Sequence, residues 1–146
     1  MINILLSVLG TLGFCAILNV RKKSIIYVII GSFISAFVYE ILFNYYMLDT
    51  FISSFFASFS IGIYSEIIAR LKKMPSTVIF LPSSIPLLPG GSLYYAMNNL
   101  VLKNNKAFIK YAIDTLNTGA GIALGALATM ICVFIIRNLR KKQKEP

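Results

Sequence analysis

The chain has 146 residues, of which 58% are hydrophobic and 13% are charged. Soluble domains carry about 25% charged residues, so this composition excludes a soluble enzyme core and a disordered chain. The absence of histidine also removes imidazole metal sites and histidine-dependent catalytic centres. The net charge of +9 comes from short basic clusters that flank long apolar runs, a pattern typical of membrane topology and not of nucleic-acid binding.

Five apolar runs follow one another along the chain, and each is long enough to cross a bilayer core of about 30 Å as a helix. They cover residues 2–20, 25–43, 50–69, 74–102 and 113–136. We therefore predict an all-α integral membrane protein, with one transmembrane domain of five helices over residues 1–146 that ends in a basic cytoplasmic tail at 137–146. We expect no metal, no cofactor and no enzyme activity, because the sequence contains no nucleophile–base pair and no cluster of metal ligands.

The basic residues predict the orientation of this domain. With the N-terminus outside the cell and the C-terminus in the cytoplasm, 11 of the 14 basic residues lie on the cytoplasmic side of the plasma membrane. The other three, Lys103, Lys106 and Lys110, fall on the outer side or belong to an amphipathic interfacial helix from Asn104 to Asp114. The opposite orientation would reverse this ratio.

Three acidic residues lie in or near the apolar runs, where a charge is unfavourable and therefore marks a functional candidate. Glu66 precedes Arg70 by one helical turn, so a structural ion pair competes with a functional role. Asp114 lies near the start of the last run, where a carboxylate complements the helix dipole. Glu40 has no basic neighbour in sequence, and snorkelling to the interface competes with a buried site. All three are candidates for proton coupling, with Glu40 first and Glu66 second.

Small residues recur at a four-residue spacing in two of the runs. The third run has Ser54, Ser58 and Gly62, and the fifth has Gly121 and Gly125. Small residues at this spacing let helices approach closely, so we expect both stripes to pack helix against helix. A polar lining along a substrate route is the alternative, and both interpretations require contact with protein instead of lipid.

The fourth run contains four prolines and cannot form one regular helix, because each proline lacks an N–H group and clashes with the preceding turn. Transporters use such broken helices to bind substrates. We expect Gly90 and Gly91 to let the backbone turn, and Ser92 to cap a half-helix whose positive end faces the break. A proline-kinked packing helix is the alternative. The candidate substrate-binding residues are Ser83, Ser84, Pro86, Pro89, Gly90, Gly91 and Ser92.

Three stretches match the motifs of one membrane-protein family. They are Phe14 to Lys22; Ser65-Glu66 with Ala69-Arg70, Lys73 and Pro75; and Ile85 to Gly90 followed by Tyr94 and Tyr95. In this order and spacing the chain resembles, over nearly its whole length, the small five-span subunit of threonine/serine exporters. Leu18 departs from the pattern, since the family commonly has phenylalanine before the asparagine.

This resemblance implies a half-transporter that exports threonine, serine or related small carboxylates and is driven by the proton gradient. It also implies a larger partner subunit with a soluble N-terminal part and five more spans. Two other functions stay open from the residues alone. A small multidrug exporter is disfavoured because residues 2–20 contain no acid, and a non-transporting scaffold subunit would need the small-residue stripes but not the break.

Overall fold

The computed structural model describes the backbone of residues 2–142 and the side chains of residues 6–139. Every regular element in this part of the chain is helical, so the predicted all-α class is confirmed. The elements are α1 (Ile2–Ile17), α2 (Lys22–Glu40), the π-helical turn η1 (Ile41–Tyr45), α3 (Thr50–Lys72), α4 (Thr77–Ser83), the 3₁₀ turn η2 (Ile85–Leu87), α5 (Gly90–Val101) and α6 (Asn105–Lys142). The predicted basic tail is helical as far as Lys142, and its last four positions lie outside the described residues.

Within residues 2–142, three helical segments are long and apolar enough to cross a membrane: Lys22–Tyr45, Thr50–Lys72 and Asn105–Leu139. Two further apolar helices, Leu6–Ile17 and Thr77–Leu87, are shorter. Many large apolar side chains on these helices face outward. Outward apolar side chains suit a surrounding of lipid, in which every backbone polar group is satisfied inside the helices.

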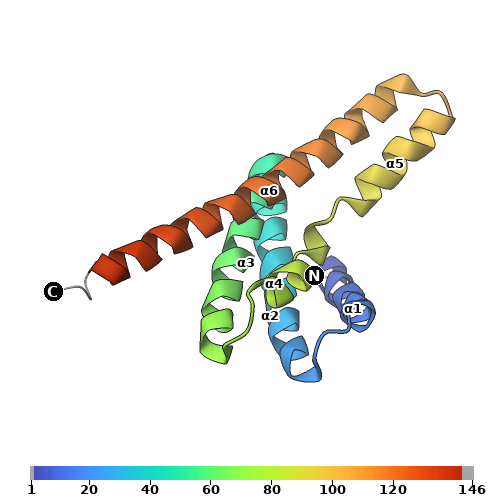
Figure 1. Cartoon of the computed structure of the whole chain (residues 1–146). Coiled ribbons are helices and arrows are strands. Elements are labelled where there is room, and N and C mark those ends of the chain that lie inside the picture. The colour runs from blue at the N-terminus through green and yellow to red at the C-terminus, as the bar shows by residue number, and fades with distance from the viewer. Residues whose placement is uncertain (1, 143–146) are drawn as a thin grey trace.

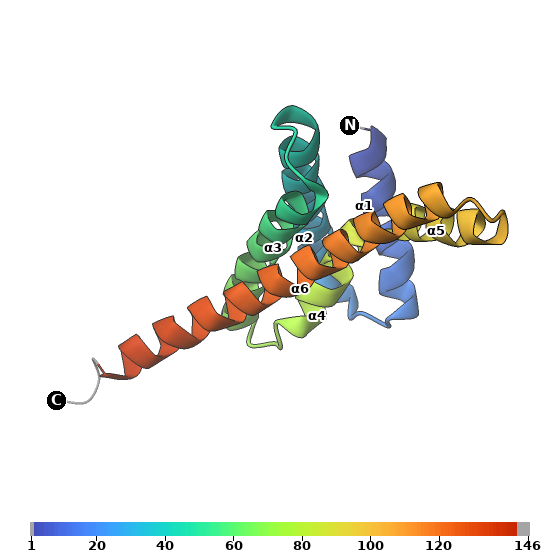
Figure 2. The same cartoon turned by 90° about the horizontal axis from the view of Figure 1, so that it is seen from above.

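Helix α3 lies at the centre of the bundle and packs against α2, α4 and α6. Helix α1 contacts α2, η2 and α4, and it stands at the edge of the bundle away from α3 (Figure 2). Helix α5 turns back along the first half of α6, and this hairpin projects beyond the other helices (Figure 1). Helix α6 then runs diagonally across α3, so the two helices separate towards their ends (Figure 1).

The loops after α1 and after α3 lie together at one end of the bundle (Figure 1). Ser24 at the start of α2 donates a hydrogen bond from Oγ to the Met74 sulfur over 3.9 Å. This end therefore brings together the basic clusters 21–23 and 70–73, which the sequence analysis assigns to the same side of the membrane.

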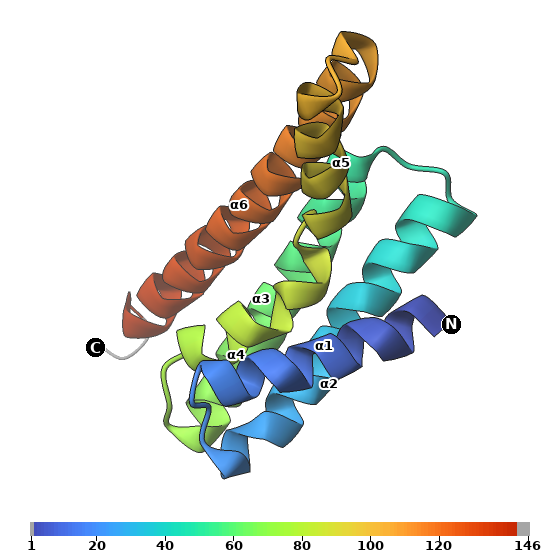
Figure 3. The same cartoon turned by 90° about the vertical axis from the view of Figure 1, so that its right-hand side faces the viewer.

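Helices α3 and α6 run in the same direction and touch through their backbones, side by side in Figure 3. A Cβ atom placed on Gly121 would lie 2.6 Å from the Phe51 carbonyl oxygen, and one on Gly125 would lie 2.5 Å from the Phe55 carbonyl oxygen. Protein Cβ atoms do not approach a backbone oxygen this closely, so only glycine fits at either position. We call this contact the α3–α6 seam.

Hydroxyl groups join the same two helices. Ser58 Oγ donates to the Ile122 carbonyl oxygen at 2.9 Å, and Thr129 Oγ1 donates to the Phe59 carbonyl oxygen at 3.3 Å. A hydrogen bond between membrane helices contributes about 0.6 kcal/mol on average, so close backbone packing carries most of the stability of the seam. The residues of the two predicted packing stripes all lie in it: Ser54, Ser58, Gly62, Gly121 and Gly125.

Helix α6 is continuous over 38 residues, about 57 Å at 1.5 Å per residue. It begins at Asn105, so Lys110 lies on the helix that also forms the predicted fifth span. A separate interfacial helix over residues 104–114 is therefore wrong. The physical reason is that no proline or glycine occurs between Asn105 and Gly119 to end the helix.

The seam predicts unequal effects of alanine at two glycines of α6. Gly125→Ala should destabilise the purified protein by about 1–3 kcal/mol, because the added methyl group overpacks against the Phe55 carbonyl oxygen. Gly119→Ala is the matched control, since a Cβ atom there would meet nothing within 4 Å. Thermal denaturation in detergent measures both, and equal midpoints for the two variants would contradict the seam.

Candidate functional site

The chain leaves α-helical geometry between Ser83 and Gly90. Pro86 lies in the 3₁₀ turn, and Leu88 after it is extended, with φ −62° and ψ 129°. Leu88 precedes Pro89, and a residue before proline is disfavoured in the α region because the proline ring clashes with it. Helices α4 and α5 are therefore two short helices on either side of a proline-directed bend.

The two glycines of the fourth run do not lie in the turn in which they are expected. Gly90 and Gly91 form the first turn of α5, and no glycine in the described residues has a positive φ. The expectation that they make the turn is wrong, because Leu88 and Pro89 already make it. Ser92 is not the helix cap either, since α5 begins two residues earlier and Ser92 Oγ donates back to the Pro89 carbonyl oxygen at 3.3 Å.

A cavity of about 300 Å³ lies beside this bend, and we call it the break cavity. The end of α2, η1, the start of α3 and the first half of α6 line it together with residues 86–89 and Ser92. Its polar lining residues are Tyr39, Thr50, Ser92, Asp114 and Thr118, and its apolar lining includes Pro86 and Pro89. The fold thus brings three predicted substrate-binding residues to one predicted proton-coupling acid.

Asp114 supplies a negative charge to the break cavity. In the described part of the chain, no lysine or arginine side chain lies within ion-pair distance of its carboxylate. Tyr39 and Ser92 add hydroxyl groups to the same lining. Helix α5 begins beside the cavity, and the first N–H groups of a helix have no partner in the helix itself and carry the positive end of its dipole. The arrangement can receive the two opposite charges of a small zwitterion.

Three other predicted residues lie elsewhere. Ser83 is buried against α2, where its Oγ donates to the Val28 carbonyl oxygen at 3.2 Å and Ser35 Oγ donates to the Ser83 carbonyl oxygen at 2.9 Å. Ser84, directly after α4, donates from its Oγ to the Leu81 carbonyl oxygen at 2.8 Å. These bonds give both serines a role in packing. Glu40 is the half-buried last residue of α2 and does not line the break cavity.

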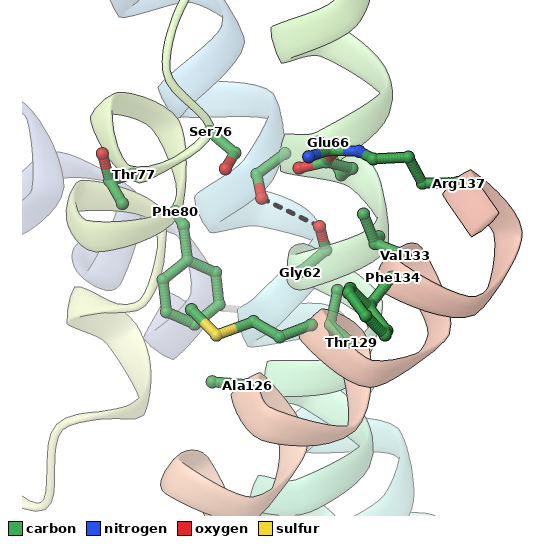
Figure 4. A pocket seen from close by; sticks show the side chains of 12 residues that line it. Gly62, Glu66, Ser76, Thr77, Phe80, Ala126, Thr129, Val133, Phe134 and Arg137 are labelled. Atoms are coloured by element: carbon green, nitrogen blue, oxygen red, sulfur yellow. Dashed lines mark hydrogen bonds between the residues drawn. The ribbon is translucent and has the colours of Figure 1, made fainter. Parts of the chain in front are cut away.

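A second cavity, of about 260 Å³, lies towards the other end of the α3–α6 seam, between α3, α4 and α6 (Figure 4). We call it the Glu66 cavity. Arg70 Nη2 and Nε donate to Glu66 Oε1 at 3.1 and 3.2 Å, so the ion pair that the sequence spacing favours is present. Glu66 also lines the cavity, and Arg137 extends from α6 towards it (Figure 4).

The chain matches the family model described as "Threonine/Serine exporter, ThrE" over residues 3–132. The chain belongs to the threonine/serine exporter family. The resemblance seen in the sequence motifs is thereby confirmed, and with it the assignment to a multi-pass plasma-membrane protein of amino-acid export. Neither the search of curated proteins nor the search of solved structures gave a match.

In this member of the family, the sequence did not point to Arg137 and Thr129 as residues of the Glu66 cavity. Arg137 looks like the first residue of a basic tail, and 71 positions separate it from Glu66. The four-residue step of the seam is the signal that connects them. One step beyond Gly62 gives Glu66 on α3, and successive steps from Gly125 give Thr129, Val133 and Arg137 on α6.

Proposed function

We propose that this chain is the small membrane subunit of a proton-driven exporter of threonine, serine or similar small hydrophilic amino acids, and that the break cavity binds the substrate. The observation that carries the proposal is the family match over residues 3–132, which covers every residue that lines this cavity. The volume of about 300 Å³ supports a small ligand, since it is at the lower end of the range for ligand pockets.

The lining residues set the orientation of the bound substrate in the break cavity. Its carboxylate faces the first turn of α5 beside Pro89 and Ser92, where N–H groups and the helix dipole favour an anion. Its ammonium group faces Asp114, and its own hydroxyl group meets Tyr39 or Thr118. Charge-assisted hydrogen bonds of this kind are the strongest available to such a ligand.

Asp114 also supplies the proton coupling. Its carboxylate holds either a proton or the substrate ammonium group, and a group that alternates between the two exchanges one for the other across the membrane. Asp114 replaces Glu40 as the first candidate for proton coupling, because Asp114 lines the same cavity as Ser92 and Glu40 does not. Glu66, the remaining candidate, lines the second cavity.

The five spans of this proposal are α1, α2 with η1, α3, the pair α4 and α5, and α6. The fourth span is two half-helices joined at the bend, which places non-helical backbone against a cavity, the setting in which membranes tolerate it. Residues 1–146 form one transmembrane domain with a basic cytoplasmic tail. The resemblance supports a partner, the larger exporter subunit with a soluble N-terminal part and five spans.

Asp114→Asn should abolish threonine efflux driven by a proton gradient while leaving threonine exchange measurable. The amide still accepts a hydrogen bond from an ammonium group but does not exchange a proton. Reconstituted vesicles that contain the chain and its larger subunit give both rates. Asp49→Asn is the matched control, because Asp49 is exposed in the loop before α3 and its side chain makes no cap hydrogen bond.

An Asp114→Asn variant with wild-type efflux and unchanged pH dependence would remove the break cavity from the coupling mechanism. Vesicles with this chain alone test the partner. Full activity without the larger subunit would contradict the half-transporter, and no flux in either preparation would favour a scaffold role.

The proposed orientation has the N-terminus outside and the C-terminus in the cytoplasm. It is supported by the gathering of the basic clusters 21–23 and 70–73 at one end of the bundle.

Single cysteines test this orientation after Cys15 and Cys132 are replaced by alanine. Met47→Cys, in the loop between α2 and α3, should react with a membrane-impermeant thiol reagent added to intact cells, because Met47 is 84% exposed at the predicted outer end. Lys22→Cys should react only after the cells are opened, although Lys22 is also exposed. The reverse labelling pattern would overturn the orientation.

A further inference from the structure

We propose that the Glu66 cavity is a second amino-acid site, in which Glu66 binds the ammonium group and Arg137 the carboxylate of a small zwitterion. This inference rests on the proposed function, because its ligand is the transported amino acid. It adds a site at the opposite end of the seam, and Arg137 in this site lies outside both the matched residues 3–132 and the sequence motifs.

The charges in this cavity are arranged for two opposite groups. Both hydrogen bonds from Arg70 end on the same oxygen of Glu66, Oε1, at 3.1 and 3.2 Å. The other oxygen, Oε2, is left to a further donor such as an ammonium group. Arg70 offsets the charge of Glu66, so Arg137 gives the cavity a net positive charge that favours a carboxylate.

The rest of the lining suits a small hydroxylated ligand. Ser76 and Thr77 come from the start of α4, and Thr129 comes from α6. Ser76 precedes the first residue of α4 but its side chain makes no cap hydrogen bond, so its hydroxyl group is available to a ligand. The volume of about 260 Å³ is close to that of the break cavity.

The position of the Glu66 cavity indicates its role on the path of the substrate through the bundle. Thr50 in the break cavity and Glu66 in the second cavity are separated by about 24 Å along α3. The backbone contacts at Gly121 and Gly125 close the space between them. The Glu66 cavity lies towards the end of the bundle that carries the basic cluster 70–73, where a substrate carboxylate is attracted on arrival.

Protection of two reporter cysteines from a small thiol reagent tests this site in membranes. The chain with Cys15 and Cys132 replaced by alanine carries either Ser76→Cys in the Glu66 cavity or Ser92→Cys in the break cavity. Threonine should slow the labelling of each reporter several-fold. 3-Hydroxybutyrate, which lacks the α-ammonium group of threonine, should need about a tenfold higher concentration to protect position 76.

Charge-removing variants assign the protection to one cavity. Arg137→Gln should abolish threonine protection at position 76 and leave protection at position 92 intact, whereas Asp114→Ala, which removes the charge and also the hydrogen-bond acceptor, should do the reverse. Lys22→Gln removes a charge at the same end of the bundle without touching either lining and should change neither. Thr77→Cys provides a second reporter in the Glu66 cavity if the protein with Ser76→Cys does not fold.

The outcomes separate this inference from the proposed function. Protection at position 92 without protection at positions 76 and 77 overturns the second site and leaves the break cavity as the substrate site. Protection at 76 without protection at 92 supports the second site and overturns the break cavity. Equal protection by threonine and 3-hydroxybutyrate would overturn the role of Glu66 as the ammonium ligand.

Discussion

The backbone contact between α3 and α6 is the constraint on which the rest of this structure depends. Lipid offers no hydrophobic drive for helices to associate, so their packing has to come from close van der Waals contact. Gly121 and Gly125 allow that contact because their hydrogens lie where a Cβ atom would overlap the carbonyl groups of Phe51 and Phe55. Helix α6 crosses α3 at this point (Figure 1). Residues of both helices on either side of the crossing line the two cavities.

The polar groups inside the bundle are also arranged around this close helix contact. Hydroxyl groups in the middle donate to backbone carbonyls of neighbouring helices, as Ser58 does to Ile122 and Ser83 does to Val28. These bonds satisfy the hydroxyl groups of Ser58 and Ser83 without placing a charge between tightly packed helices. The acids that face cavities, Asp114 and Glu66, lie beyond the close contact, where space for a ligand exists. The proposed export of zwitterions needs charges that a ligand can reach, and the close contact of the seam lies between the two acids.

The sequence predicts the helical class and the residues of the seam, because composition and the four-residue spacing are local properties of the chain. It also predicts that prolines interrupt the fourth run, since the loss of an N–H group at Pro86 and Pro89 does not depend on context. It misplaces the turn and the start of α5, because Gly90 and Gly91 are equally compatible with a turn and with a first helical turn. It does not find Arg137, because the pairing of α3 with α6 that brings Arg137 to the Glu66 cavity is a long-range contact.

Disulfide cross-linking of the seam in native membranes tests the central claim most directly. The cysteine pairs at 57 with 122 and at 58 with 122 should cross-link on mild oxidation, because Ile122 packs against the core cluster that contains Ala57, and its carbonyl oxygen accepts from Ser58 Oγ at 2.9 Å. The shifted pairs at 58 with 118 and at 54 with 126 should not, since these shifts of four and eight residues move the partners about 6 and 12 Å apart along the helix. Efficient cross-linking of the shifted pairs, or none of the paired ones, would contradict a parallel seam in this register and the two cavities that depend on it.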